Sequence, residues 1–196
     1  MLRLLAAALL LCMGAPALAQ PAPAPVPAPV RVTLQTSAGD IVVEVDRQRA
    51  PITSGNFLRY VDERRYEGGM FYRAMQGGVG RGLIQGGVDP RRALPPIAHE
   101  PTSRTGLSHV DGALAIARAA PGTATADIYI TLGDMTYLDA GRADPDGYAV
   151  FGRVVEGMDV VRRILAAPTS PTEGEGSMRG QMLSPRIRIL GARRLE

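Results

Sequence analysis

The sequence predicts a mainly β domain, an antiparallel barrel of short strands with two helices covering its ends. Two observations lead to this prediction. Apolar and polar residues alternate with a period of two in several short segments, which Gly, Pro, Asp and Ser separate, and this pattern is typical of strands joined by turns. Only two segments, beginning near Pro51 and Met158, space their apolar residues as a helix does. Many short strands with few helices favour a barrel.

The first residues are expected to lie outside this domain. Residues 1–19 have the features of a secretory signal peptide: Leu4–Met13 is almost wholly apolar, and Ala17-Leu18-Ala19 offers small residues for cleavage after Ala19. The apolar run is too short to span a bilayer, so no stable membrane anchor is expected, with an uncleaved anchor as the alternative. Residues 20–29 alternate proline with alanine or valine and predict an extended linker. The domain then spans residues 30–196.

The domain is expected to open with a β-hairpin. Apolar residues alternate with polar ones in Val30–Gln35, and Ile41–Val45 has apolar residues at its odd positions. Gly39-Asp40 between them has the composition of a turn.

Two helices and several short strands are expected to follow. The first helix begins at Ala50-Pro51, because proline is favoured in a first turn, and its inward stripe is Phe57, Tyr60 and Val61. The second helix spans Met158–Ala166, and Pro168 lies just past its end. The strands are expected at Met70–Arg73, Leu83–Gln85, Leu114–Ala117, Ile128–Thr131, Tyr148–Val155 and Arg186–Leu190.

Composition excludes several functional classes. The chain has 22 basic and 19 acidic residues, a net charge of +3, and the basic residues are all arginines without a basic run, so no nucleic-acid binding is expected. The absence of lysine excludes a P-loop. The single cysteine, Cys12, lies in the predicted signal peptide, so the mature chain has no thiolate. His99 and His109 are expected to be surface or loop residues, and no metal site is predicted. Four acidic residues are interpreted as solvated loop charges: Asp134, Asp139, Asp144 and Asp146.

Arg73 is the most informative single residue. It ends the apolar, strand-like segment Met70–Arg73, and a glycine-rich loop leads from it to Gln85-Gly86-Gly87. Burying a guanidinium without a partner is costly, so such an arginine is either paired structurally or held in a pocket for use. From this segment alone both interpretations stay open.

The order of these motifs resembles the cyclophilin-type peptidyl-prolyl isomerases. The helix motif is Ala50-Pro51-Ile52-Thr53-Ser54-Gly55-Asn56-Phe57, and Phe71-Tyr72-Arg73 and Gln85-Gly86-Gly87 follow it. Leu114–Arg118 is similar to the family's substrate-facing strand. Tyr137-Leu138-Asp139 and the run from Tyr148 to Met158, the most specific signal, match its final third. The resemblance covers about residues 30–196.

The resemblance implies a closed eight-stranded barrel capped by two helices. It also implies an isomerase of X–Pro bonds in proline-containing polypeptides, with Arg73 as the catalytic donor and Gln85 orienting it and contacting the substrate. Leu83, Tyr129 and Leu138 would form the proline pocket, and Ala117, Tyr137 and Tyr148 would line the groove. No cofactor or metal is implied. Together with the signal peptide, Tyr148 suggests the exported bacterial branch and a periplasmic location, and a monomer is expected.

The sequence also departs from the family pattern. The loop from Ala74 to Gly82 is longer, and Gly82 takes the place of a large proline-gripping aromatic, for which Val79 is the replacement if the loop folds inward. Tyr137 replaces a tryptophan. Asp127 replaces a glutamine and, if it faces the groove, could form a charge-assisted pair with Arg73. Such a pair would either hold Arg73 in place or withdraw the donor that the prolyl nitrogen needs, and our hypothesis is that Asp127 lowers activity.

Two functions therefore stay open at this stage. The first is an active isomerase that assists the folding of exported proteins. The alternative is a peptide-binding or chaperone module that keeps the fold and groove but has little or no activity.

Overall fold

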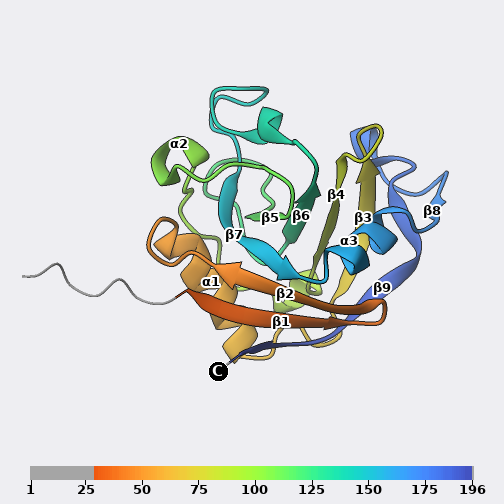
Figure 1. Cartoon of the computed structure of the whole chain (residues 1–196), viewed down its shortest axis with the longest axis horizontal. Helices are drawn as coiled ribbons and strands as arrows, with labels where there is room; N and C mark the ends of the chain where they lie inside the picture. The colour runs from red at the N-terminus through yellow and green to blue at the C-terminus, as the bar shows by residue number, and fades with distance from the viewer. Residues whose placement is uncertain (1–28, 196) are drawn as a thin grey trace, which may run out of the picture.

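The fold is a closed antiparallel barrel of eight strands. The computed structural model describes residues 29–195, so the predicted signal peptide and residues 20–28 of the predicted linker lie outside the described residues. The barrel strands follow the order β1-β2-β7-β5-β6-β4-β3-β9, and β9 pairs back with β1 to close it (Figure 1). Their bounds are β1 Val30–Thr36, β2 Gly39–Val45, β3 Met70–Gln76, β4 Gly82–Gly87, β5 Ala113–Ile116, β6 Ile128–Leu132, β7 Ala149–Glu156 and β9 Met182–Arg194. The predicted fold class is confirmed.

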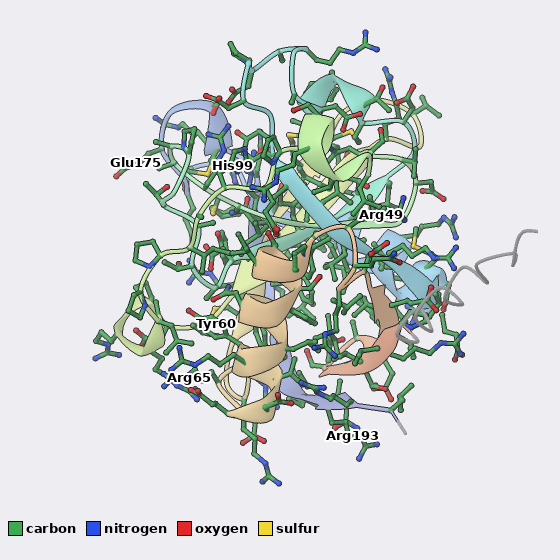
Figure 2. The ribbon with its side chains drawn as sticks, turned by 90° about the vertical axis from the view of Figure 1, so that its left-hand side faces the viewer. Arg49, Tyr60, Arg65, His99, Glu175 and Arg193 are labelled. Carbon is green, nitrogen blue, oxygen red and sulfur yellow. The ribbon has the colours of Figure 1, made fainter. Side chains whose placement is uncertain are left out.

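The two predicted helices are present, on different sides of the barrel in Figure 1. They are α1, Pro51–Asp62, and α3, Met158–Leu165. In Figure 2 α1 stands in front of the sheet, with Tyr60 labelled beside it. A third, four-residue helix, α2 (Thr102–Thr105), was not predicted, because one turn is too short to show helical periodicity.

A buried glutamate completes the start of α1. The N-cap residue, Ala50, has no side chain that can cap. The carboxylate of Glu100, which is 1% exposed, instead accepts hydrogen bonds from the backbone N–H groups of Ile52 and Thr53, at 3.1 and 2.7 Å, and from the Thr53 hydroxyl. A negative charge at this end of a helix satisfies its free N–H donors and complements its dipole. Glu100 therefore fixes α1 against the barrel.

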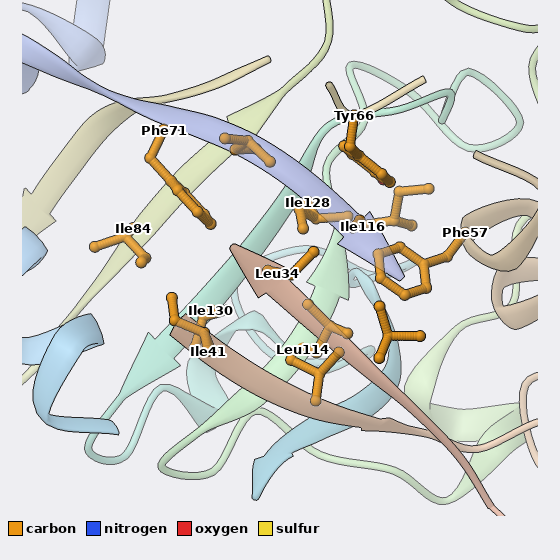
Figure 3. Packing of buried hydrophobic residues seen from close by; sticks show 14 of the residues in the cluster. Leu34, Ile41, Phe57, Tyr66, Phe71, Ile84, Leu114, Ile116, Ile128 and Ile130 are labelled. Carbon is orange, nitrogen blue, oxygen red and sulfur yellow. The ribbon is translucent and has the colours of Figure 1, made fainter. Parts of the chain in front are cut away.

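The barrel interior is filled by branched aliphatic and aromatic side chains. Leu34, Ile41, Leu114 and Ile130 are fully buried, and Figure 3 shows them packed with Phe57 of α1 and with other buried residues. Burial of each such side chain contributes about 1.5–3 kcal/mol. The interior is therefore a packed core, and any ligand site has to lie on the outside of the barrel.

The closing strand is longer than the sequence predicts. It runs over Met182–Arg194 rather than Arg186–Leu190, although Pro185 lies within it. Its pairing with β3 shifts register between Ile187 and Met182, so the proline falls where no regular ladder bond is lost. The two-residue strand β8, Thr169–Ser170, pairs with this first part of β9 and was not predicted because it is too short.

Two polar contacts from the α1 region hold the segment that leads into β6. The side-chain amide of Asn56 donates to the backbone carbonyl of Thr125 at 2.6 Å. The hydroxyl of the buried Tyr66 donates to the carbonyl of Ala126 at 3.0 Å. These two contacts fix the backbone immediately before Asp127.

Candidate active site

A groove of about 700 Å³ lies on the outer face of the barrel. All nine site residues named from the sequence line it: Arg73, Leu83, Gln85, Ala117, Asp127, Tyr129, Tyr137, Leu138 and Tyr148. They come from β3, β4 and β6, from the residues flanking β5, β6 and β7, and from the 3₁₀ turn Thr136–Leu138. The topology therefore brings together residues that are up to 75 positions apart in the chain.

Arg73 is half-buried on β3 and is held by two glutamines. Its Nη1 donates to Oε1 of Gln85 at 2.8 Å, and its Nε donates to Oε1 of Gln181 at 2.8 Å. No residue between 29 and 195 accepts a hydrogen bond from its Nη2. Burial lowers the pKa of Arg73, but a guanidinium stays protonated in proteins. One cationic N–H group is therefore left for a ligand in the groove.

The orientation of Gln85 is set by a chain of hydrogen bonds. Its amide nitrogen donates to the hydroxyl of Tyr72 at 2.7 Å, and that hydroxyl donates to Oδ2 of Asp127 at 2.7 Å. Since an ionised carboxylate can only accept, the tyrosine proton points to Asp127 and its oxygen accepts from the amide. The carbonyl oxygen of Gln85 must then face Arg73. Tyr72 was not predicted from the sequence as a site residue.

The predicted direct pair between Asp127 and Arg73 is wrong. The carboxylate of Asp127 bonds instead to Tyr72 and packs against Gly87, where a Cβ atom would collide with it. Burial raises the pKa of Asp127, although the hydrogen bond from Tyr72 opposes this. Burial likewise raises the pKa of Tyr72, and the nearby carboxylate adds to that effect. The hydrogen bonds of Tyr72 and Gln85 connect Asp127 to Arg73.

Apolar residues form the other part of the groove. Leu83, Tyr129 and Leu138 belong to a cluster on this outer face, together with Met75, which lies opposite Leu83 in the β3–β4 pairing. The ring of Tyr129 is 3% exposed and meets the Tyr148 ring edge-on, with centroids 6.0 Å apart. This wall has the character of a pocket for a small apolar ring.

The Tyr129 hydroxyl has a buried partner. It lies 2.8 Å from Nε2 of His109, whose Nδ1 lies 2.6 Å from Oδ1 of Asp139. His109 was predicted to be a surface or loop residue. It does lie in a loop, after α2, but it is fully buried rather than at the surface. Burial lowers the pKa of His109, although Asp139 opposes this. Burial would raise the pKa of Asp139, but hydrogen bonds from Ser108 and His109 bring it below its ordinary value.

The interpretation of the acidic loop residues as solvated charges is corrected for two of the four. Asp139 bonds to His109, and Asp144 accepts from Nη2 of Arg118 at 2.9 Å. Arg118, which also lines the groove, stacks over the Tyr148 ring with its Cζ 4.8 Å from the centroid. Asp134 and Asp146 are exposed, as expected.

Neither Gly82 nor Val79 provides a side chain that could replace the family's proline-gripping aromatic in the groove. A Cβ atom at Gly82 would collide with the Met75 carbonyl and approach Leu165 of α3, so this position faces away from the groove. Val79 is fully exposed and does not fold inward. The β3–β4 hairpin instead contributes the apolar side chains of Met75 and Leu83 to the groove.

The segment before β9 forms one wall of the groove. The sequence suggested only a flexible surface loop at 172–176, but Glu175, Met178 and Met182 line the groove, and Gln181 bonds to Arg73. This segment has no apolar periodicity that could have indicated the role. Within residues 29–195 no cluster of metal-ligating side chains occurs, and no helix has the length and apolar character needed to cross a membrane.

The chain is similar to known isomerases. The family model for cyclophilin type peptidyl-prolyl cis-trans isomerase matches residues 31–192. The peptidyl-prolyl cis-trans isomerase of Acinetobacter baylyi is 38% identical over 71% of this chain and 73% of its own length. Peptidyl-prolyl cis-trans isomerase B of Escherichia coli is 37% identical over 70% of this chain and 85% of its own length. A solved Cryptosporidium parvum cyclophilin, 20% identical over 85% of this chain and 99% of its own, shares the fold with a TM-score of 0.69.

The match therefore spans nearly all of the described barrel, with the segments that carry Arg73, Gln85 and the pocket wall inside it. The chain belongs to the cyclophilin-type peptidyl-prolyl cis-trans isomerase family.

Proposed function

We propose that the groove around Arg73 binds proline-containing polypeptides and accelerates cis–trans exchange of their X–Pro bonds. The observation that carries this proposal is the geometry of Arg73. Two glutamine carbonyls hold two of its nitrogens, while Nη2 has no partner among residues 29–195 and the side chain lines a groove with an apolar wall. Membership of an isomerase family supports the same reaction.

The reaction requires stabilisation of a twisted imide. Rotation is slow because it breaks amide resonance, at a barrier of roughly 18–20 kcal/mol. In the twisted state the prolyl nitrogen is no longer conjugated and gains a lone pair. A fixed cationic N–H donor that meets this lone pair stabilises the twisted state over both planar states. Arg73 supplies such a donor through Nη2.

The remaining groove residues have distinct proposed roles. Leu83, Tyr129 and Leu138 hold the proline ring against the apolar wall. Gln85 orients Arg73 through its carbonyl, and its amide nitrogen is already engaged by Tyr72. Ala117, Tyr137 and Tyr148 line the groove on either side, where the residues flanking proline would lie.

The test is a protease-coupled isomerisation assay on a short Ala-Pro peptide. Removing one preorganised donor typically costs 10²- to 10³-fold in rate, so Arg73→Ala is expected to lose about that factor. Gln76→Ala is the matched control, because Gln76 lies on the same strand but outside the groove, and its side chain donates to the Leu165 carbonyl. Equal rates for wild type and Arg73→Ala would contradict the proposal.

A binding module without turnover is the second candidate. The specific observation in its favour is that residues 74–82 contain no aromatic side chain, which leaves the proline pocket to Met75, Leu83, Tyr129 and Leu138. Negligible rates for both wild type and Arg73→Ala, together with measurable peptide binding, would establish this alternative.

We further propose that the substrates are exported proteins in the periplasm, and that the protein acts there as a monomer. The apolar run Leu4–Met13 and the small residues before Gln20 support export. Fusing residues 1–29 to a reporter that is active only outside the cytoplasm tests this. An inactive reporter would contradict export.

A further inference from the structure

The segment between β8 and β9 reaches the proposed catalytic arginine. Nε of Arg73 donates to Oε1 of Gln181 at 2.8 Å, across a separation of 108 residues in the chain. We propose that Gln181 is a positioning residue for the isomerase reaction, which fixes the plane of the Arg73 guanidinium so that Nη2 faces the groove. This inference rests on the proposed function of Arg73.

Two holding points are needed because of the shape of the arginine side chain. A guanidinium is planar and sits at the end of a long, flexible stem. A single hydrogen bond from Nη1 to Gln85 leaves the plane free to turn about that bond. A second bond from Nε to Gln181, on another edge of the plane, removes this freedom. Because misplacement of a reacting group by about 1 Å can cost 10²-fold in rate, this restraint bears directly on turnover.

Gln181 is itself held in the required orientation. Its side-chain nitrogen donates to the backbone carbonyl of Ser177 at 2.8 Å. Its backbone carbonyl accepts from the N–H of Ala74, the residue after Arg73, at 2.9 Å. The first contact makes the amide present its oxygen to Arg73, and the second joins this segment to β3 beside the arginine.

The supporting turn is closed by its own hydrogen bonds. The N–H of Gly180 donates to the carbonyl of Glu173 at 2.9 Å, and Gly174 and Gly180 have φ values of 91° and 82°. These values lie in the left-handed region that favours glycine. The turn therefore delivers Gln181 as part of a defined structure, and its residues Glu175 and Met178 line the same groove.

The test compares three variants in the isomerase assay. Gln181→Leu removes the acceptor for Nε, and Gln181→Glu keeps an acceptor at the same distance along the side chain. Gln76→Leu is the control, because Gln76 lies on β3 but outside the groove. Because Gln181→Leu leaves the guanidinium free to turn away from the reacting position, it should lower kcat about 10- to 100-fold with KM nearly unchanged. Gln181→Glu keeps the acceptor for Nε but loses the hydrogen bond to the Ser177 carbonyl, so it should recover part of the loss. Gln76→Leu should match wild type.

A second readout does not depend on turnover. In NMR spectra of ¹⁵N-labelled protein, the Nε–H of Arg73, assigned by its disappearance in Arg73→Lys, should exchange slowly in wild type and Gln181→Glu but rapidly in Gln181→Leu. If Gln181→Leu does not fold, Gln181→Asn replaces it, because its shorter side chain withdraws the acceptor. Unchanged kcat together with unchanged Nε–H exchange would overturn the inference. Slow exchange in a wild type without isomerase activity would support the positioning contact and contradict only the proposed function.

Discussion

Tyr72 and Asp127 should behave as one unit, because a single hydroxyl links them to Gln85. Tyr72→Phe removes two hydrogen bonds of 2.7 Å, one from the Gln85 amide and one to the Asp127 carboxylate. A neutral bond is worth about 1 kcal/mol and a bond to a charge about 1.5–3 kcal/mol. Both residues are half-buried, so water can replace part of the lost hydrogen bonding. We therefore expect Tyr72→Phe to lower the free energy of unfolding by about 2 kcal/mol.

The double variant makes this expectation sharp. Asp127→Ala alone should cost about 1 kcal/mol, because it removes the charged acceptor but also a carboxylate that burial disfavours. Once the Tyr72 hydroxyl is absent, the Asp127 carboxylate has no hydrogen-bond partner left among residues 29–195. Tyr72→Phe/Asp127→Ala should therefore cost about 2 kcal/mol rather than the additive 3, a coupling of about 1 kcal/mol.

Urea unfolding of the four proteins measures the coupling. Tyr137→Phe is a matched control for stability, because Tyr137 is 45% exposed and its hydroxyl makes no hydrogen bond with residues 29–195. In the isomerase assay, Tyr72→Phe should lower the rate about fivefold, since about 1 kcal/mol of orientation of Gln85 is lost. Additive stability effects within about 0.3 kcal/mol, with an unchanged rate in Tyr72→Phe, would refute the hydrogen-bond chain.

Two further predictions concern the groups that hold the barrel and its pocket wall. Glu100→Ala should lower the free energy of unfolding by about 3 kcal/mol, because it leaves N–H donors of α1 and the Thr53 hydroxyl without their acceptor. Thermal and urea unfolding measure this change in stability. Glu63→Ala, at the exposed end of α1, is the control and should change the free energy of unfolding little. Equal effects of the two variants would contradict the capping role of Glu100. His109 should make stability fall as pH drops below about 6.5, because burial lowers its pKa and the unfolded chain takes up the proton first. In His109→Gln the free energy of unfolding should not fall in this way between about pH 7 and pH 5. Asp139, with a pKa below 3.8, affects stability only at lower pH. Parallel curves of stability against pH for wild type and His109→Gln would contradict the role given to His109.

The sequence predicted the parts of this structure that depend on local pattern. The hairpin of β1 and β2, the helix beginning at Pro51 and the helix beginning at Met158 all follow from periodicity and turn chemistry. The location of Arg73 opposite Gln85 follows from the resemblance, and the register of β3 and β4 pairs these two residues directly.

The parts that were not predicted depend on which distant residue each polar side chain bonds to. Tyr72, Arg73 and Asp127 all line the groove, and the Asp127 carboxylate bonds to Tyr72 while it packs against Gly87, a residue that leaves room for it. Gln181 bonds to Arg73 across 108 residues, a contact that no local pattern encodes. The burial of His109 likewise depends on the Tyr129 hydroxyl and on Asp139, which lie in distant segments.

The central claim is that a guanidinium held by Gln85 and Gln181 presents Nη2 to the prolyl nitrogen. The most direct measurement is the isomerase rate of Arg73→Lys beside Arg73→Ala, with folding of both verified by circular dichroism. Lysine keeps the charge but not the planar set of donors. We predict that Arg73→Lys loses about 10²-fold or more and approaches Arg73→Ala. A rate for Arg73→Lys within a few-fold of wild type would contradict the claim, because charge alone would then suffice.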